Sequence, residues 1–229
     1  MNKIKLFLLD LFFPNRCAVC NEITIFDKYV CDDCMKKLLE SAIDEEKVCG
    51  MCGKYIGCSH DDLWYSRAVS CFYYIDCVRE GIYSLKEKNR NFGYYIAGIL
   101  ADTIKSDEIL KNADYIIAVP MSKDRLRKRG YNQAEVIAKE VSCQTGIPLL
   151  KKVLFKNKSA VQHLLSYEER LKNVDSIYSS ETNLEGKKII VCDDVLTTGS
   201  TVNRCAKLLI NMNAADVYAA VGTIVKHKI

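Results

Sequence analysis

Short apolar runs and helical patterns of apolar residues alternate along most of the chain. Apolar or alternating segments rich in β-branched and aromatic residues predict strands over 68–74, 114–120, 187–192 and 216–225. Apolar residues at helical spacing predict helices over 77–89, 92–105, 132–146 and 201–213. Strands that alternate with helices in this way predict an α/β fold, with a mainly parallel sheet covered by helices on both faces.

The first part of the chain lacks this alternation. Residues 1–66 are rich in cysteine and contain few periodic segments, so we predict a small N-terminal module there and an α/β domain over 67–229. At the start of the chain, Leu6, Leu9 and Phe13 lie on one face of a predicted amphipathic helix. That apolar run is too short to span a bilayer, and no small-residue cleavage site follows it.

Composition places the chain among globular proteins. It has 229 residues, of which 49% are hydrophobic and 27% charged, and its net charge is +4. This charge is too small to indicate nucleic-acid binding by itself, so any basic surface must be local. Without a membrane span or a signal peptide we expect a cytoplasmic protein, in which the 12 cysteines are thiols or metal ligands.

Two C-x-x-C pairs near the N-terminus predict a zinc site. Each pair can chelate one metal from a tight turn, and four thiolates complete a tetrahedral site; the residues are Cys17, Cys20, Cys31 and Cys34. Two unrelated thiol pairs or a redox motif are alternatives, but redox C-x-x-C motifs occur singly. A region this small needs metal to hold a core, so a structural role is favoured over a surface for nucleic acid or a partner.

A second group of candidate ligands follows, and its interpretation stays open. The residues are Cys49, Cys52, Cys58 and His60. Three thiolates and one imidazole can bind a second zinc, yet His60 follows Cys58 by only two residues, which is a cramped spacing. A crossed arrangement, in which two zinc ions share the seven cysteines of this region, is the alternative.

The segment "IIVCDDVLTTGSTV" predicts an anion site. A buried strand delivers Asp193 and Asp194 to the carboxyl end of the sheet, where doubly wound folds bind ligands. The small, hydroxyl-rich turn 197–201 then opens a helix, whose N–H groups and dipole favour an anion. The alternative is a helix capped by Ser200 or Thr201 beside two surface acids. No P-loop lysine and no dinucleotide-binding glycine pattern is present.

These motifs resemble a known family. "IIVCDDVLTTGST" is similar to the phosphoribosyl-pyrophosphate (PRPP) binding motif of type I phosphoribosyltransferases. "AVPMSKDRLRKRGYNQAEVIA", "QHLLSYEERLKNV" and the opening "FLLDLFFPNRCAVC" resemble segments of the ComF family of competence-associated proteins. The resemblance implies a type I phosphoribosyltransferase-like fold, plus a small N-terminal zinc-binding module.

The resemblance also implies residue roles. The loop of Thr197, Thr198, Gly199, Ser200 and Thr201 would hold the 5-phosphate of PRPP. Asp193 and Asp194 would face the ribose hydroxyls, with Mg²⁺ bridging those hydroxyls and the pyrophosphate. The pyrophosphate would be bound by Met121, Ser122, Lys123 and Arg129, and a flap would contain Gln162, Arg170 and Asn173.

Two functions follow from the resemblance. The first is an enzyme that displaces pyrophosphate from ribose by a nitrogen nucleophile; the acceptor stays open, because no nucleobase-specific hood is visible. The second is a non-catalytic PRPP sensor that binds single-stranded DNA through basic segments 123–130 and 151–158, with a DNA-uptake helicase as a further partner. A purely structural zinc protein is a third reading, against which the PRPP-like motif argues.

Overall fold

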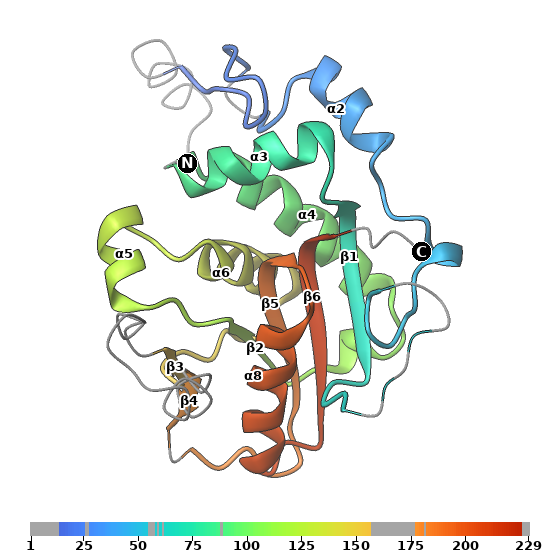
Figure 1. Cartoon of the computed structure of the whole chain (residues 1–229), viewed down its shortest axis with the longest axis vertical. Helices are drawn as coiled ribbons and strands as arrows, with labels where there is room; N and C mark the ends of the chain where they lie inside the picture. Colours follow the sequence, from blue (N-terminus) through green and yellow to red (C-terminus); the bar gives the residue numbers. More distant parts are fainter. Residues whose placement is uncertain are drawn as a thin grey trace, which may run out of the picture.

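The structure is a computed structural model of the chain, and it describes residues 14–25, 28–54, 58, 60, 62–87, 89–156, 177–180 and 182–225. The helix predicted at the N-terminus lies outside these residues. The elements, labelled as in Figure 1, are α2 (Asp32–Leu39), the 3₁₀ helix η1 (Glu45–Lys47), β1 (Arg67–Tyr73), α3 (Asp76–Lys86), α4 (Asn91–Ser106), the 3₁₀ helix η2 (Leu110–Asn112), β2 (Tyr115–Ala118), α5 (Lys123–Arg129), α6 (Gln133–Thr145), β3 (Leu154–Lys156), β4 (Ile177–Ser179), β5 (Lys188–Leu196), α8 (Ser200–Asn211) and β6 (Asp216–Ile224).

In the part of the chain that the structure describes, four parallel strands form the central sheet, in the order β1-β6-β5-β2. The alternation of strands and helices in the sequence predicted this arrangement, and the structure confirms it. Ala118 at the end of β2 pairs with Cys192 of β5, and the N–H of Val119 donates to the Cys192 carbonyl over 3.0 Å. The segments that follow these two points therefore emerge side by side at the carboxyl edge of the sheet.

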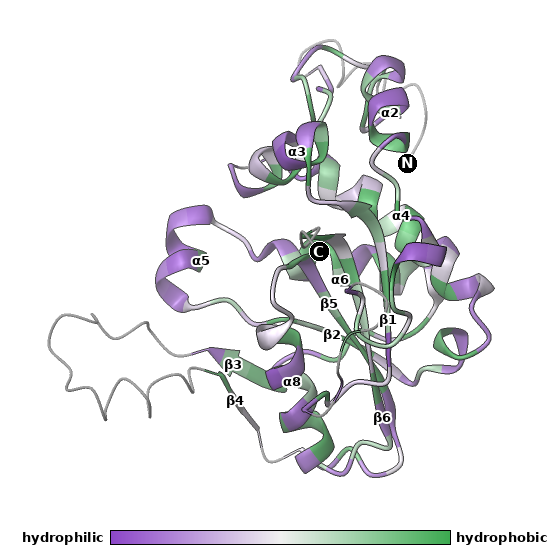
Figure 2. Ribbon diagram, turned by 45° about the vertical axis from the view of Figure 1, so that its right-hand side comes forward, coloured by the Kyte–Doolittle hydropathy of each residue, from purple (hydrophilic) through white to green (hydrophobic). Residues whose placement is uncertain are grey.

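Helices cover both faces of the sheet. Along β5, Ile190 and Cys192 pack into the core beneath α3, α4 and α6, whereas Ile189 and Val191 pack into the core beneath α8. Successive side chains of a strand point to opposite faces, so one apolar run supplies both cores. Figure 1 shows α8 in front of the sheet with α4 and α6 behind it, and Figure 2 shows the hydrophobic strands enclosed between them.

The cysteine-rich segment continues along the outer edge of the sheet. The N–H of Tyr73 in β1 donates to the Ser41 carbonyl over 2.8 Å, and the N–H of Ala68 donates to the Gly50 carbonyl over 2.8 Å. These bonds satisfy edge groups of β1 that would otherwise be unpaired. The described parts of this segment around Ser41 and Gly50 thus lie against the sheet.

Two features of the fold differ from the sequence-based predictions. The basic run 123–130, for which no helix was predicted, forms helix α5 over Lys123–Arg129 and ends at Gly130, whose φ is +83°. A short antiparallel pair, β3 with β4, was not predicted. Within the described residues, no helix is both long enough and apolar enough to cross a membrane.

Candidate functional site

Two adjacent aspartates lie within β5 near its carboxyl end. The sequence predicted that this strand stops at Cys192, but it continues through Asp193 and Asp194 to Leu196. The strand continues because Leu196 is buried and pairs with Ile224 of β6, so burial and parallel hydrogen bonds both extend it. Sheet hydrogen bonds, and not a loop, therefore hold the two aspartates.

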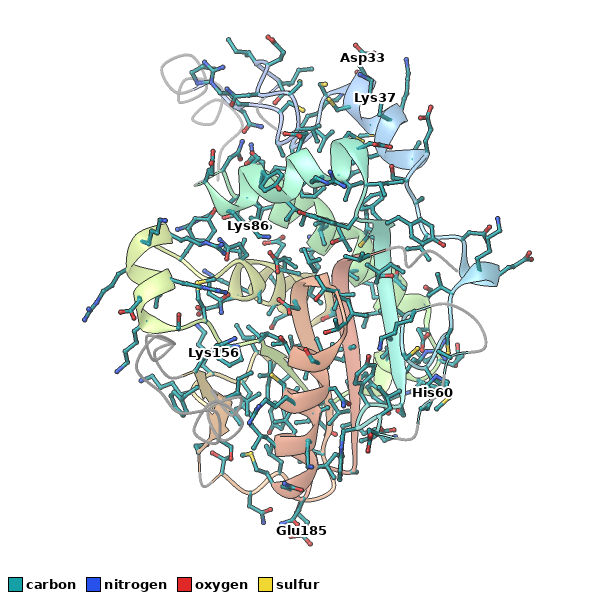
Figure 3. The ribbon with its side chains drawn as sticks, viewed as in Figure 1. Asp33, Lys37, His60, Lys86, Lys156 and Glu185 are labelled. Atoms are coloured by element: carbon teal, nitrogen blue, oxygen red, sulfur yellow. The ribbon has the colours of Figure 1, made fainter. Side chains whose placement is uncertain are left out.

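The two carboxylates lie close to each other, because the side chain of Asp194 interacts directly with that of Asp193. Oδ2 of Asp194 lies 3.8 Å from Nζ of Lys86 at the end of α3. Asp193 lies on the α8 face, where Lys156 of β3 is a nearby charge. Figure 3 shows Lys86 and Lys156 on the side of the sheet where α5 lies.

The surroundings of Asp193 disfavour its charged form. Burial raises the pKa of its carboxyl well above the ordinary value, and the neighbouring charge of Asp194 raises it further. The N–H of Asp194, which donates to Oδ1 of Asp193 over 2.9 Å, and the cation of Lys156 oppose this increase only in part. A bound cation, or a ligand hydroxyl that donates to the carboxylate, would stabilise the ionised form of Asp193. Carboxyl groups with a shifted pKa are common at functional sites.

The hydroxyl-rich turn 197–201 connects β5 to α8. Gly199 has φ +79° and occupies the N-cap position, with no side-chain cap hydrogen bond to the helix. The simple capping role considered for Ser200 or Thr201 is therefore wrong. The hydroxyl of Thr198 donates to Oγ of Ser200 over 2.9 Å and accepts from the Ser200 N–H over 3.3 Å. The N–H groups in the first turn of a helix have no partners within the helix, which favours an anion at this end of α8.

The segment after β2 forms the other wall of the site. Met121 and the buried Ser122 follow β2, and Ser122 is the N-cap of α5. Lys123 begins α5 and is exposed. At the far end of this helix Nη1 of Arg129 donates to Oε1 of Gln133 over 3.1 Å, which fixes the direction of the guanidinium group.

The motif "RGYNQ" joins this wall to the rest of the fold. The hydroxyl of buried Tyr131 and the amide of Gln133 both donate to the carbonyl of Leu85, the residue before Lys86. Nδ2 of Asn132 donates to the carbonyl of Val119 over 2.9 Å, and its Oδ1 accepts from the first turn of α6. The motif thus positions the end of α3 and the start of the 119–122 loop together.

These elements enclose a cavity of about 180 Å³, which we call the aspartate cavity. Of the predicted residues, the cavity is lined by Asp193, Asp194, Met121, Ser122, Arg129 and Thr201. Five more polar or charged lining residues were not among the predicted site residues: Lys86, Arg125, Asn132, Gln133 and Lys156. Four cations and two acids therefore meet in one small space, a composition suited to an anionic ligand that also carries hydroxyls.

The turn 197–201 is divided between two cavities. Thr201 lines the aspartate cavity, whereas Thr198, Gly199 and Ser200 line a neighbouring cavity of about 360 Å³. Neither cavity is lined by Lys123 or Thr197. The predicted flap residues Gln162, Arg170 and Asn173 lie outside the described residues, so their assignment stays a prediction.

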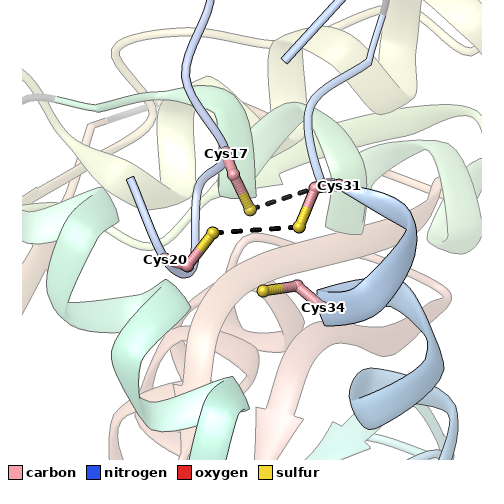
Figure 4. A group of neighbouring side chains, drawn as sticks. All are labelled: Cys17, Cys20, Cys31 and Cys34. Atoms are coloured by element: carbon pink, nitrogen blue, oxygen red, sulfur yellow. Dashed lines mark hydrogen bonds between the residues drawn. The ribbon is translucent and has the colours of Figure 1, made fainter. Parts of the chain in front are cut away.

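The first four cysteines converge on one point. Cys17 and Cys20 come from a turn, Cys31 is the N-cap of α2, and Cys34 lies in its first turn (Figure 4). Their four Sγ atoms lie within 4.8 Å of one another, and Sγ of Cys20 is 3.8 Å from Sγ of Cys31. Zinc–sulfur bonds of about 2.3 Å in a tetrahedron separate the sulfurs by about 3.8 Å, so this donor set fits zinc.

The second group converges as well. Nε2 of His60 lies 3.3 Å from Sγ of Cys49 and 3.2 Å from Sγ of Cys58, and Sγ of Cys52 lies 3.0 Å from Sγ of Cys58. The two-residue spacing between Cys58 and His60 therefore does not prevent both from reaching one ion. The two ligand groups are also separate in space, so the crossed sharing of cysteines is not the arrangement found.

The thiols within each group differ in acidity. Burial acts to raise the pKa of Cys17, but N–H groups directed at its sulfur, Cys31 N–H foremost, outweigh burial and lower the pKa to about 7. Burial and neighbouring thiols raise the pKa of Cys34. In the second group the pKa of Cys49 is likewise lowered to about 7, while burial raises that of Cys52 to about 12. N–H groups already directed at sulfur favour thiolates, the form that binds metal.

Comparison with known proteins gives two matches to protein families. A model described as the phosphoribosyl transferase domain matches residues 87–227. A model described as the double zinc ribbon domain matches residues 8–71. The first match confirms the predicted fold class, and the second, with the two donor sets, confirms the zinc-binding character of the N-terminal region.

Relatives that match over most of their length are named for competence or for DNA utilization. The chain is 28% identical over 226 residues to competence protein F of Haemophilus influenzae, covering 90% of this chain and 95% of the relative. It is 28% identical over 212 residues to DNA utilization protein YhgH of Escherichia coli, covering 88% and 86%. It is 26% identical over 189 residues to competence protein ComFC of Streptococcus pneumoniae, covering 82% and 77%. These relatives confirm the resemblance to ComF-type proteins.

Proposed function

Because this chain belongs to the family of phosphoribosyl transferase domains, we propose that its aspartate cavity binds PRPP together with Mg²⁺. The observation that carries the proposal is the convergence of Asp193, Asp194 and Thr201 with the 119–122 loop in one cavity. An acid pair beside a hydroxyl-rich helix N-terminus suits a sugar phosphate, with acids for the ribose hydroxyls and N–H groups for the phosphate.

Each part of PRPP has a complementary part of the site. The 5-phosphate would be held by the turn 197–201, and the ribose hydroxyls by Asp193 and Asp194. The pyrophosphate would lie against the 119–122 loop, where Arg125 and Arg129 supply cations. When bound, Mg²⁺ supplies positive charge to the pyrophosphate oxygens, and the hard oxygen atoms of this site suit that ion.

The reaction that we propose is displacement at C1 of the ribose. The bond from C1 to the pyrophosphate oxygen breaks and its electron pair leaves with the pyrophosphate. A nitrogen nucleophile forms the new bond to C1 and loses its proton to solvent or to a base. The cations of Lys86, Arg125 and Arg129 would stabilise the charge on the departing pyrophosphate, in a site where preorganised charge is effective.

Calorimetry tests the binding. Wild-type protein is titrated with PRPP in the presence and absence of Mg²⁺, beside the double variant Asp193→Asn/Asp194→Asn. We expect Mg²⁺-dependent binding that the double variant loses, at least tenfold, while its circular dichroism spectrum is unchanged. The matched control is Asp102→Asn, which removes an exposed carboxylate from α4. Equal affinity of wild type and double variant would remove these acids from the site.

Isotope-labelled PRPP tests turnover. A panel of nucleobases and amines is offered as acceptors, and pyrophosphate release is measured. Release with one acceptor class supports the transferase. If PRPP binds and no acceptor releases pyrophosphate, the transferase proposal fails and the protein is a PRPP sensor.

We propose two structural zinc ions per chain, one in each ligand group. The support is the agreement between the donor geometry of both groups and the match to a double zinc ribbon. Metal analysis after purification without chelators would give two zinc ions per chain. The 12 cysteines, all free, suit a reducing compartment, and we propose a cytoplasmic location.

A second candidate function is binding of single-stranded DNA, with a DNA-uptake helicase as a further partner. Helix α5 favours it: the helix has five cationic residues and one acid, buries none of its residues and stands away from the sheet in Figures 1 and 2. Such a helix suits backbone-directed, salt-dependent contact with nucleic acid. The names of the relatives point in the same direction.

Fluorescence anisotropy with labelled single-stranded DNA tests this candidate. Arg127→Gln/Lys128→Gln removes two cations of α5 that do not line the aspartate cavity, and Lys36→Gln/Lys37→Gln on α2 is the matched control. We expect binding that weakens with salt, a smaller salt slope for the α5 variant and an unchanged slope for the control. A weak signal independent of salt would contradict DNA binding.

A further inference from the structure

The cavity of about 360 Å³ beside the aspartate cavity lies between the second zinc-ligand group and the turn 197–201. One wall consists of Thr198, Gly199, Ser200 and Asn203, from the turn and the first helical turns of α8. The other wall comes from the cysteine-rich region and includes Cys52, Lys54, His60 and Tyr65. The double zinc ribbon therefore contributes half of a cavity whose other half is the predicted phosphate loop.

Lys54 lies against that loop. Its Cε would be 3.5 Å from a Cβ atom built on Gly199, and the phenol oxygen of Tyr65 would be 3.3 Å from the same point. The ammonium group of Lys54 is one bond beyond Cε, so it lies close to the N-terminus of α8. The side chain of Lys54 is half-buried, and none of the described carboxylates forms an ion pair with it.

The metal-ligand turn determines where Lys54 lies. The N–H of Cys49 donates to the Lys54 carbonyl over 3.1 Å, and the N–H of Gly53 donates to the Cys49 carbonyl over 2.8 Å. Gly53 has φ +71°, and a Cβ there would lie 3.1 Å from Cβ of Ala68 and 3.3 Å from Leu196. The turn that carries two of the ligands is thus pressed against the sheet and directs Lys54 toward α8.

Further bonds fix the two walls to each other. Tyr65 is buried, and its hydroxyl donates to the Cys52 carbonyl over 3.0 Å. Asn203 of α8 accepts from the Trp64 N–H over 2.7 Å and donates to the Asp62 carbonyl over 2.7 Å. The ammonium of Lys207 lies 5.0 Å from the centre of the Trp64 ring. These contacts hold the second zinc-ligand group close to the N-terminal part of α8.

We propose that Lys54 binds the 5-phosphate of the ligand, the group that the loop 197–201 would hold. The second zinc-ligand group would thereby supply a cation to this loop. This inference rests on the proposed function and extends it, since a phosphate monoester in the loop would meet hydroxyls and N–H groups on one side and a cation on the other. Asp62, an exposed acid that also lines this cavity, opposes the positive charge.

Calorimetric titration with ribose 5-phosphate and, separately, pyrophosphate tests the proposal. The variants are Lys54→Met, which removes the ammonium group and keeps the rest of the side chain similar in length, Lys54→Arg, which keeps the charge, and the control Lys47→Met. Lys47 lies in the same region, is exposed and pairs with Asp44 at 2.6 Å, outside the cavity. Zinc content is measured for each variant to show that the ribbon is intact.

We expect Lys54→Met to bind ribose 5-phosphate about tenfold more weakly, because it loses a charge-assisted contact. Pyrophosphate affinity should change less than twofold, Lys54→Arg should recover most of the loss, and Lys47→Met should match wild type. If Lys54→Met keeps the wild-type affinity for ribose 5-phosphate, the inference about Lys54 is overturned and the proposed function is not. The same holds if Lys54→Met loses affinity equally for ribose 5-phosphate and pyrophosphate. If wild type binds neither PRPP nor ribose 5-phosphate, the proposed function and the inference are both overturned.

Discussion

The carboxyl group of Asp193 is the point at which stability and ligand binding conflict. Its pKa is raised by burial and by Asp194, so in the folded protein without ligand its ionised form is disfavoured. In the unfolded chain the carboxyl ionises near its ordinary pKa of about 3.9. As pH increases from there through the raised folded pKa, ionisation favours the unfolded chain and stability decreases.

Asp193→Asn is therefore expected to stabilise the protein at pH 7, because an amide keeps the bond from the Asp194 N–H without the charge. The gain should be about 1 kcal/mol, or about 2–4 °C in thermal midpoint, and should disappear below about pH 4. Thermal unfolding across pH 3.5–8 measures it. A variant equal to or less stable than wild type at pH 7 would contradict the assignment.

Asp114→Asn is the control of opposite sign. The Lys188 N–H, which donates to Oδ2 of Asp114 over 2.9 Å, and then Lys187 lower the pKa of Asp114. Its contribution to stability is present above its ordinary pKa and is lost as pH falls through the lowered value. Asp114→Asn should thus reduce stability at neutral pH, where Asp193→Asn increases it.

The sequence indicated residues whose chemistry depends on local spacing. Both zinc-ligand groups and the acid pair were predicted, because the members of each lie close together in the sequence and form recognisable pairs. Lys86 and Lys156 were not predicted, since each is an ordinary lysine at the end of its element. They become site residues only because the fold places the ends of α3 and β3 beside β5. No local sequence pattern predicts that arrangement.

At the scale of elements, helix α5 shows where hydrophobic periodicity fails. The four long helices predicted from the α/β region each bury an apolar face, whereas α5 buries no residue. A helix without a buried face leaves no apolar period to detect. Its start at Ser122 and its left-handed end at Gly130 were the available signals.

Asn132 connects two elements of the site, and its loss should separate stability from binding. Asn132→Ala removes the N-cap of α6, which costs about 1 kcal/mol, and the bond to the Val119 carbonyl that holds the 119–122 loop. Asn132→Ser restores the cap but not the donor to Val119. We expect Ser to recover most of the stability in chemical denaturation, while both variants bind pyrophosphate more weakly in calorimetry. Full recovery of pyrophosphate affinity by Ser would show that the loop does not depend on this bond.

At the scale of the whole molecule, the two zinc-ligand groups support different parts of the fold. Cys17 and Cys34 pack into the core formed with α3 and α4, and Nδ2 of Asn91 in α4 donates to the Arg16 carbonyl over 2.8 Å. The second group instead adjoins the turn 197–201 through Tyr65 and Lys54. We therefore expect the first zinc-ligand group to stabilise the fold and the second to support the proposed phosphate site as well.

Single cysteine variants should reveal this division. Cys34→Ser and Cys52→Ser should each contain one zinc per chain against two in wild type, and each should unfold about 5–10 °C lower, since metal binding contributes to folding. Measured at a temperature where all three proteins are folded, Cys52→Ser should lose affinity for ribose 5-phosphate more than for pyrophosphate, because the turn bearing Lys54 loosens. Cys34→Ser should keep the wild-type ratio of the two affinities. An equal ratio in both variants would mean that the second ribbon stabilises the fold without contributing to the phosphate site.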